Sequence, residues 1–352
     1  MRTGAAGDYE GEVGMIVSSA GDCGDCVYNL AVIKDIPDGP HDFILRRSGM
    51  TTLKTDEAVV TLFNKLKPLI DTLPYIREFR IAKPDEHADW NSADFRGAFH
   101  RRDHSLMQAH ALHYHSIFKQ HVIHDPMVPW IPAPQDEVIT SDVIINRTSR
   151  YRNPFFPWKA IVEHYADRIR FIGHPAEHRE FCDRYGDVTY QPTADYLWVA
   201  RAIAASQLFI GNQSSCYAVA EGLKHNTIQE TCLDLHDCIF KRPNAVYVGD
   251  GAVTLPDIAG SGTLSIPAMS VGVRHRRTNN TPPGGFTCNG INSNSIEALV
   301  SSVKSVRGNQ LTEDQIREAI LEEQHRLHPE FYRNTWQEEL VARFNEEVAA
   351  MK

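Results

Sequence analysis

The chain has 352 residues, 42% of them hydrophobic and 23% charged, a composition typical of folded globular proteins that excludes a disordered or fibrous chain. Its formal charge of −9 excludes nucleic-acid binding driven by the overall field of the molecule. No stretch reaches the roughly 18 apolar residues of a membrane helix, and the first residues lack a signal-peptide pattern. We therefore expect a soluble cytoplasmic protein, and the length predicts two domains.

Apolar runs alternate with amphipathic stretches through the first 82 residues. The helical stretches place apolar residues at helical spacing, whereas the third strand alternates with period two. This order of strands and helices predicts a parallel α/β domain. The predicted elements are strands at 14–18, 43–45 and 76–82 and helices at 25–34 and 58–73.

A proline-rich stretch at 125–137 predicts the domain linker, because each of its four prolines removes a backbone donor and disfavours helix before it. After the linker the alternation of strands and helices restarts, which predicts a complete doubly wound domain. The predicted elements are strands at 142–146, 169–172, 188–190 and 208–210 and helices at 157–165, 177–185, 196–205 and 215–223.

The last third of the chain is less regular. Residues 253–294 are rich in Gly, Pro, Ser, Thr and Asn, which indicates a long loop or a small β insertion. Two helices are predicted at 314–327 and 329–350. The predicted domains are therefore 1–130 and 138–328, the second carrying the insertion, followed by a terminal helix at 329–352 that packs back on the first domain.

The loop after the first predicted strand contains Cys23-Gly24-Asp25-Cys26. A Cys-x-x-Cys pair indicates a dithiol or half of a zinc site, but no second pair with suitable spacing accompanies it. Asp25 falls at the start of a helix, where a carboxylate is favoured by the free N–H groups and the helix dipole. It is either an ordinary helix cap or a general base that faces a ligand.

Two further loops follow predicted strands at the edge where α/β sheets bind ligands. The loop after residues 208–210 leads into a helix whose first residues could bind an anion or simply cap the helix. The loop after residues 142–146 is basic, and arginine binds phosphate oxygens in a bidentate manner. Its candidates are Arg152 and Arg150, with Arg147 ranked below them, and the alternative is a plain surface cluster.

Two segments resemble the heptosyltransferase-like glycosyltransferases of glycosyltransferase family nine. The segment GDCVYNLAVIKDI at 24–36 is similar to the first loop and helix of that family, with Ala31 where the family usually has Pro. The segment DYLWVARAIAASQLFIGNQSSCYAVAEGLKHNTIQE at 195–230 is similar to its closing motif, although Asn-Gln-Ser-Ser stands where members often have Thr-Asp-Thr-Gly.

The resemblance implies a GT-B architecture, in which two Rossmann-like doubly wound domains face a cleft. It implies inverting, metal-independent transfer of a hexosyl or heptosyl group from a nucleotide-sugar donor to an acceptor hydroxyl, without a cofactor. Asp25 would be the catalytic base, and Glu221 would bind the ribose unless it lies on a solvated helix face. The donor-binding residues implied are Gly24, Arg147, Arg150, Arg152, Gly211, Asn212, Gln213, Ser214, Ser215 and Glu221.

Two alternatives remain open from the sequence. A nucleotide-sugar epimerase of related fold would share the donor site but need no separate acceptor. A metal-binding or redox protein could be built on the cysteines and on the histidines of residues 100–124, such as His110 and His113, although no HExxH motif accompanies them. The acceptor is not identified by the sequence; the net charge speaks against a nucleic acid without ruling one out as acceptor.

Overall fold

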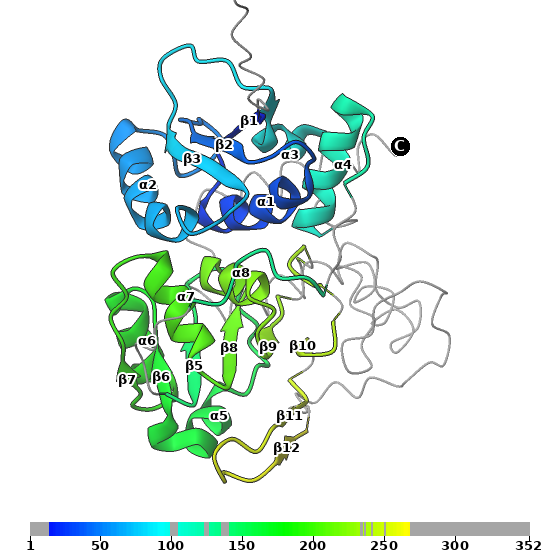
Figure 1. The fold of residues 1–352 in the computed structure, drawn as a ribbon. Helices are drawn as coiled ribbons and strands as arrows, with labels where there is room; N and C mark the ends of the chain where they lie inside the picture. Colours follow the sequence, from blue (N-terminus) through cyan, green and yellow to red (C-terminus); the bar gives the residue numbers. More distant parts are fainter. Residues whose placement is uncertain are drawn as a thin grey trace, which may run out of the picture. The chain divides into compact units, whose positions relative to one another are not determined.

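The computed structural model of the chain describes residues 14–98, 105–122, 127–134, 141–232, 235, 237–240, 242–249 and 251–267. These residues all belong to one compact unit and form two parallel sheets and a small hairpin (Figure 1). The predicted α/β class with parallel sheets is confirmed. Within the described ranges no helix is both long and apolar enough to cross a bilayer. The predicted helices 314–327 and 329–350 lie outside the described residues, as do residues 268–294 of the insertion.

The smaller sheet has four parallel strands in the order β3-β2-β1-β4. Its central strand pairs Val17 with Phe43 on one side and with Trp90 on the other. The sheet and its helices comprise β1 (Ile16–Ser19), α1 (Cys23–Asp35), β2 (His41–Leu45), α2 (Asp56–Ile70), β3 (Ile76–Ile81), β4 (Trp90–Asn91), the 3₁₀ turn η1 (Ser92–Asp94), α3 (Phe95–Ala98) and α4 (Leu106–Phe118).

The larger sheet has six parallel strands in the order β10-β9-β8-β5-β6-β7. Counted from its own first strand, this is the order 3-2-1-4-5-6 of the Rossmann fold. The elements are β5 (Val143–Asn146), α5 (Trp158–Tyr165), the 3₁₀ turn η2 (Ala166–Arg168), β6 (Ile169–Phe171), α6 (Pro175–Tyr185), β7 (Thr189–Tyr190), α7 (Tyr196–Ala204), β8 (Leu208–Asn212), α8 (Ser215–Gly222), β9 (Thr227–Glu230) and β10 (Ala245–Val248).

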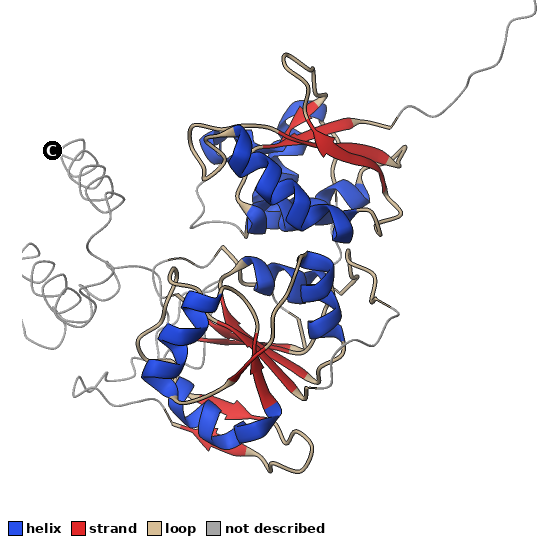
Figure 2. Cartoon of the chain, turned by 90° about the vertical axis from the view of Figure 1, so that its left-hand side faces the viewer, coloured by secondary structure: helices blue, strands red, loops and turns tan. Residues whose placement is uncertain are grey.

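Helices cover both faces of the larger sheet (Figure 2). Along β5, Ile144 packs into the cluster that contains α7 and α8, whereas Val143 and Ile145 pack into a second cluster with Trp158 of α5 and Phe181 of α6. Successive side chains of a strand point to opposite faces, so this division means that β5 is buried on both sides. That explains why its sequence is an unbroken apolar run and not an alternating one.

Several elements are absent from the sequence prediction. Strand β4 is only two residues long, and strands β9 and β10 follow α8 without a clear alternation of polar and apolar residues. Helix α4 begins with a capping box in which Ser105 and Gln108 bond each other's backbone N–H groups, a signal that its histidine-rich sequence obscures. The start of the insertion forms an antiparallel hairpin of β11 (Val253–Leu255) and β12 (Leu264–Ile266).

The two sheets share a hydrophobic core. Helix α1 packs against α8, and α2 packs against α7. Tyr28 of α1 contacts the rings of Trp130 and Phe240, and the backbone N–H groups of Trp130 and Ile131 bond the carbonyl of Gly222 at the end of α8. Buried side chains therefore join the described parts of the two sheets, and the division into two domains that face a cleft stays a prediction.

Candidate functional site

Each parallel sheet has a point where its strand order reverses, and ligands bind there, beyond the carboxyl ends of the strands. In the smaller sheet the point lies between β1 and β4, and in the larger sheet between β5 and β8. The loops that leave these strands are 20–22 after β1, 147–157 after β5 and 213–214 after β8. The predicted site residues fall in or directly after these loops, with the exceptions of Gly211 and Asn212 at the end of β8 and of Glu221 within α8.

The start of α1 is built on two aspartates one turn apart. Asp22 is the N-cap, and its backbone N–H donates to Oδ2 of Asp25 at 3.1 Å, while the Asp22 side chain accepts from the backbone of Asp25. Gly21 lies directly against Asp25, because a Cβ at Gly21 would come within 2.7 Å of the Asp25 Cβ. The Gly-Asp spacing of the sequence therefore closes a compact reciprocal cap.

Asp25 has one anchored oxygen. Its Oδ2 accepts from the Asp22 N–H and from the Arg96 guanidinium, whereas Oδ1 has no hydrogen-bond partner within the described ranges. The side chain keeps 11% of its surface exposed. Arg96 itself lies over the ring of Phe95 at 4.8 Å, which fixes its direction. A carboxylate held through one oxygen, with the other unengaged, is suited to take a proton from a bound hydroxyl.

The two sulfurs beside Asp25 are not reactive thiolates. Burial raises the pKa of Cys23 to about 12 and raises that of Cys26 further. The thiol of Cys26 lies 3.6 Å from the carbonyl of Gly21 and 3.5 Å from the hydroxyl of Ser19, which suits a packed neutral thiol. Among the residues that the structure describes, no group of three or more His, Cys, Asp or Glu side chains could hold a metal.

The start of α8 lies against the start of α1. Ser214 caps α8 by accepting from the N–H of Tyr217 at 3.2 Å and donates to Asn146 at the end of β5. A Cβ placed on Gly24 would lie 3.8 Å from the Cα of Ser215, which is ordinary contact distance. The first turns of two helices, one from each sheet, therefore meet at Gly24 and Ser215. Both turns carry N–H groups that favour anions.

The other predicted residues, at the end of β8 and directly after it, make internal contacts. Gly211 has no room for a side chain, because a Cβ would come within 2.9 Å of the Asn146 carbonyl. Asn212 is fully buried and holds the loop after β5 by bonding the backbone of Thr148 and, at 2.5 Å, the carbonyl of Arg150. Gln213 bonds Leu235 and Cys232 in the loop after β9. Asn212 and Gln213 therefore hold the loops after β5 and β9 in place.

Two of the three predicted arginines form ion pairs with glutamates of the larger sheet and its helices. Arg147 is buried and bonds both carboxylate oxygens of Glu230 at 2.8 and 2.9 Å. Arg152 bonds both oxygens of Glu180 at 2.5 and 2.8 Å, with its side chain 6% exposed. The bidentate geometry predicted for phosphate is thus used internally by both residues.

Arg150 is the exposed member of the three. Its side chain is 62% exposed, and its guanidinium lies 3.6 Å from Asp22 at the start of α1. The next residue, Tyr151, has a positive φ of 56°, a conformation that costs energy for a residue with a bulky side chain. The Asn212 and Arg152 bonds hold the backbone of this loop, so the strained turn projects Arg150 alone toward α1.

Glu221 is fully buried in an ion-pair network. Its two oxygens accept from Lys224 at 2.7 Å and from Arg242 at 2.9 Å. The structure therefore does not bring it to the other candidate residues. The sequence placed Glu221 on a face of the helix but did not reveal its partners. Lys224 follows α8, and Arg242 lies between β9 and β10.

Three residues at the site escape the sequence prediction. Asp22 carries a recognisable signal, because Asp-x-x-Asp before an apolar run is a variant of the capping box. Arg96 lies 71 positions from its partner Asp25, and Thr52 lies 30 positions from Asp22, to which it donates at 2.6 and 3.1 Å. No local pattern links partners so far apart.

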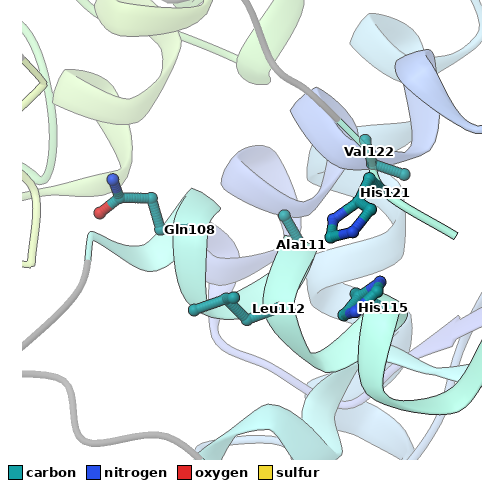
Figure 3. Close-up of a pocket in the computed structure, with 6 residues that line it drawn as sticks. All are labelled: Gln108, Ala111, Leu112, His115, His121 and Val122. Atoms are coloured by element: carbon teal, nitrogen blue, oxygen red, sulfur yellow. The ribbon is translucent and has the colours of Figure 1, made fainter. Parts of the chain in front are cut away.

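A separate hollow of about 350 Å³ lies beside α4 (Figure 3). The rings of His115 and His121 stack there, with centroids 3.9 Å apart. None of the predicted site residues lines it. The lining residues are Gln108, Ala111, Leu112, His115, His121 and Val122.

No protein-family model and no curated protein matches the chain. Among solved structures it is similar to E. coli ADP-heptose LPS heptosyltransferase II, with 12% identity and a TM-score of 0.45, over 71% of this chain and 92% of that one. It is similar to a family 9 glycosyl transferase from Veillonella parvula, with 11% identity and a TM-score of 0.44, over 67% and 86%. It is also similar to E. coli heptosyltransferase WaaC with ADP-2-deoxy-2-fluoro heptose, with 10% identity and a TM-score of 0.38, over 70% and 94%.

Proposed function

We propose that the chain is a glycosyltransferase that moves a sugar from a nucleotide-sugar donor to an acceptor hydroxyl. The observation that carries this proposal is the contact of Gly24 with Ser215. It brings the first turn of α1, which carries Asp25 with one unengaged carboxylate oxygen, against the anion-favouring first turn of α8 from the other sheet. Both lie at the strand-order reversals where α/β sheets bind ligands. A base and a diphosphate site are the two parts that such a transfer requires.

In the proposed reaction, Asp25 removes the proton of the acceptor hydroxyl as that oxygen attacks the anomeric carbon of the donor sugar. The bond from that carbon to the diphosphate breaks in the same displacement, so the configuration inverts. Arg96 keeps Oδ2 of Asp25 fixed, which leaves Oδ1 to face the hydroxyl. The proton ends on Asp25, and the nucleoside diphosphate leaves with the electron pair of the broken bond.

Charge that develops on the leaving diphosphate is stabilised by the first turn of α8 and by Arg150. Ser214 and Ser215 supply the start of the helix, and the exposed guanidinium of Arg150 supplies the positive charge. A metal ion is not needed for this step when a guanidinium and a helix N-terminus share the task, and we propose a metal-independent transfer on that basis.

Binding of nucleoside diphosphates tests the donor site directly. A thermal-shift panel of ADP, GDP, UDP and CDP should identify one that stabilises the chain, by about 2.7 kcal/mol at a hundred times its Kd. Arg150→Gln should raise that Kd by about tenfold or more, since a charged hydrogen bond to phosphate is lost. If no nucleoside diphosphate binds, the donor site is refuted.

Turnover tests the base. The donor for this assay is a nucleotide-sugar built on the nucleoside diphosphate that binds. Asp25→Asn should bind that nucleoside diphosphate as the unchanged chain does, while its rate of sugar transfer falls by about 10²- to 10⁴-fold. Asp94→Asn, an exposed carboxylate that follows β4 at the same sheet, is the matched control. Unchanged turnover in Asp25→Asn would remove Asp25 from the mechanism.

A further inference from the structure

The start of α1 carries a second carboxylate, Asp22, that the proposed reaction does not use. Its Oδ1 accepts two hydrogen bonds from Thr52, at 2.6 Å from the hydroxyl and 3.1 Å from the backbone N–H. Its backbone N–H donates to Oδ2 of Asp25 at 3.1 Å. Burial alone would raise the pKa of Asp22, but the Thr52 bonds and the charges of Arg150 and Arg96 hold that pKa below its ordinary value. Asp22 is therefore a fixed negative charge.

Asp22 faces Arg150, the most exposed of the three candidate arginines. Its Oδ2 lies 3.6 Å from Nη1 of Arg150, with side chains 28% and 62% exposed respectively. The contact is long, monodentate and partly solvated, unlike the two bidentate pairs of Arg147 and Arg152. Ion pairs of this kind contribute little to stability and are easily exchanged.

Each of the two aspartates at the start of α1 is paired with one arginine. Asp25 is paired with Arg96, and Asp22 is paired with Arg150. A diphosphate that entered here would add negative charge beside two carboxylates, and no further cation is paired with either of them among the described residues. Arg150 is the cation whose present partner costs least to replace, because its contact is the longest and most exposed of the set.

We propose that Asp22 acts as an internal stand-in for the donor diphosphate, which holds Arg150 while the site is empty and gives it up when a nucleoside diphosphate binds. This inference rests on the proposed function, because it assigns a regulatory role at the same donor site. Asp22 thereby weakens donor binding and returns Arg150 to α1 once the diphosphate product leaves. The exchange makes and breaks only ion-pair contacts, and no covalent bond changes.

Asp22→Asn tests the exchange without disturbing the fold. Asparagine remains a good helix cap and its one oxygen can still accept from Thr52, while the charge and the oxygen that faces Arg150 are lost. With the nucleoside diphosphate that binds the unchanged chain, the Kd of Asp22→Asn should fall by about two- to fivefold at low salt. The difference should vanish in about 1 M salt, where charges are screened within roughly 3 Å.

A double-variant cycle separates release of Arg150 from simple loss of a nearby negative charge. If Asp22 acts by holding Arg150, Asp22→Asn gains nothing in an Arg150→Gln background. If the gain persists there, Asp22 acts through general repulsion, and the exchange is refuted. Asp71→Asn is the matched control, because Asp71 forms a surface ion pair with Lys67 at 2.9 Å at the C-terminal end of α2.

The possible failures are distinguishable. If a nucleoside diphosphate binds the unchanged chain but Asp22→Asn binds it equally or more weakly, this inference is wrong and the proposed donor site stands. If no nucleoside diphosphate binds the unchanged chain or any variant, the donor site falls and the inference falls with it. Thermal melts of each variant without ligand, expected to lie close to the unchanged chain, confirm that the comparison is between folded proteins.

Discussion

Replacing Arg147 should destabilise the fold, in contrast to replacing Arg150. The carboxylate of Glu230 is fully buried and accepts four hydrogen bonds, from Arg147 Nε and Nη2, the N–H of Asn153 and Nε1 of Trp158. Arg147→Gln removes the only cation of this group and leaves a buried negative charge with two neutral donors. Breaking a buried ion pair in this way costs about 3–5 kcal/mol.

That loss is large against the total. Single domains are stable by about 5–15 kcal/mol, so Arg147→Gln would remove roughly a fifth or more of the free energy of unfolding. With a urea m-value of about 3 kcal/mol per molar, the midpoint should fall by about 1–2 M. Arg150→Gln, which removes an exposed pair, should change the free energy of unfolding by about 1 kcal/mol or less.

Urea denaturation followed by tryptophan fluorescence measures both variants. The double variant Arg147→Gln, Glu230→Gln should recover part of the lost stability, because it removes the stranded charge. The reasoning is refuted if Arg147→Gln keeps its urea midpoint but loses diphosphate binding. It is equally refuted if Arg150→Gln is the variant that unfolds easily.

Three further predictions follow from the packing. Gly21→Ala places a Cβ 2.7 Å from the Cβ of Asp25, so it should lower turnover and should lower the free energy of unfolding by about 1–3 kcal/mol. Gly49→Ala is the control, because nothing lies within 4 Å of its Cβ position, and it should change neither quantity. Since burial raises the pKa of Cys23 to about 12, iodoacetamide at pH 8 should label it only in urea, and rapid labelling of the folded chain, seen by mass spectrometry of its peptide, would reinstate a reactive cysteine. Burial lowers the pKa of His110 from 6.5 to about 3. Below pH 6.5 the unfolded chain therefore takes up a proton that the folded chain does not. The free energy of unfolding should then fall toward pH 3 by up to about 1.4 kcal/mol per pH unit. Urea titrations at pH 7.5 and 5 should show a smaller loss for His110→Phe, and an equal loss would contradict this assignment.

The order of the elements could be read from the sequence because it depends on local signals. Every helix and strand predicted between residues 14 and 223 is present, with ends that differ by a few residues. Apolar period and helix caps act over a few positions, so a single sequence reveals them. Strand β4 was missed because two residues carry no period, although Trp90 is fully buried beside β1.

The sequence also located the loops at which the candidate site forms, because the carboxyl ends of parallel strands are fixed once the strands are known. It could not rank the side chains within them. Arg147, Arg150 and Arg152 look alike in sequence, and only Glu230 and Glu180, 83 and 28 positions away, reveal which two are engaged.

The sequence by itself therefore determined the α/β alternation, the strand ends and the carboxylate at the start of α1, since these depend on neighbours along the chain. The tertiary structure alone decided which arginine is exposed, which oxygen of Asp25 is unengaged and that Glu221 is enclosed by cations. Ion pairs and burial join groups that are distant in sequence and close in space, and folding is what brings such groups together.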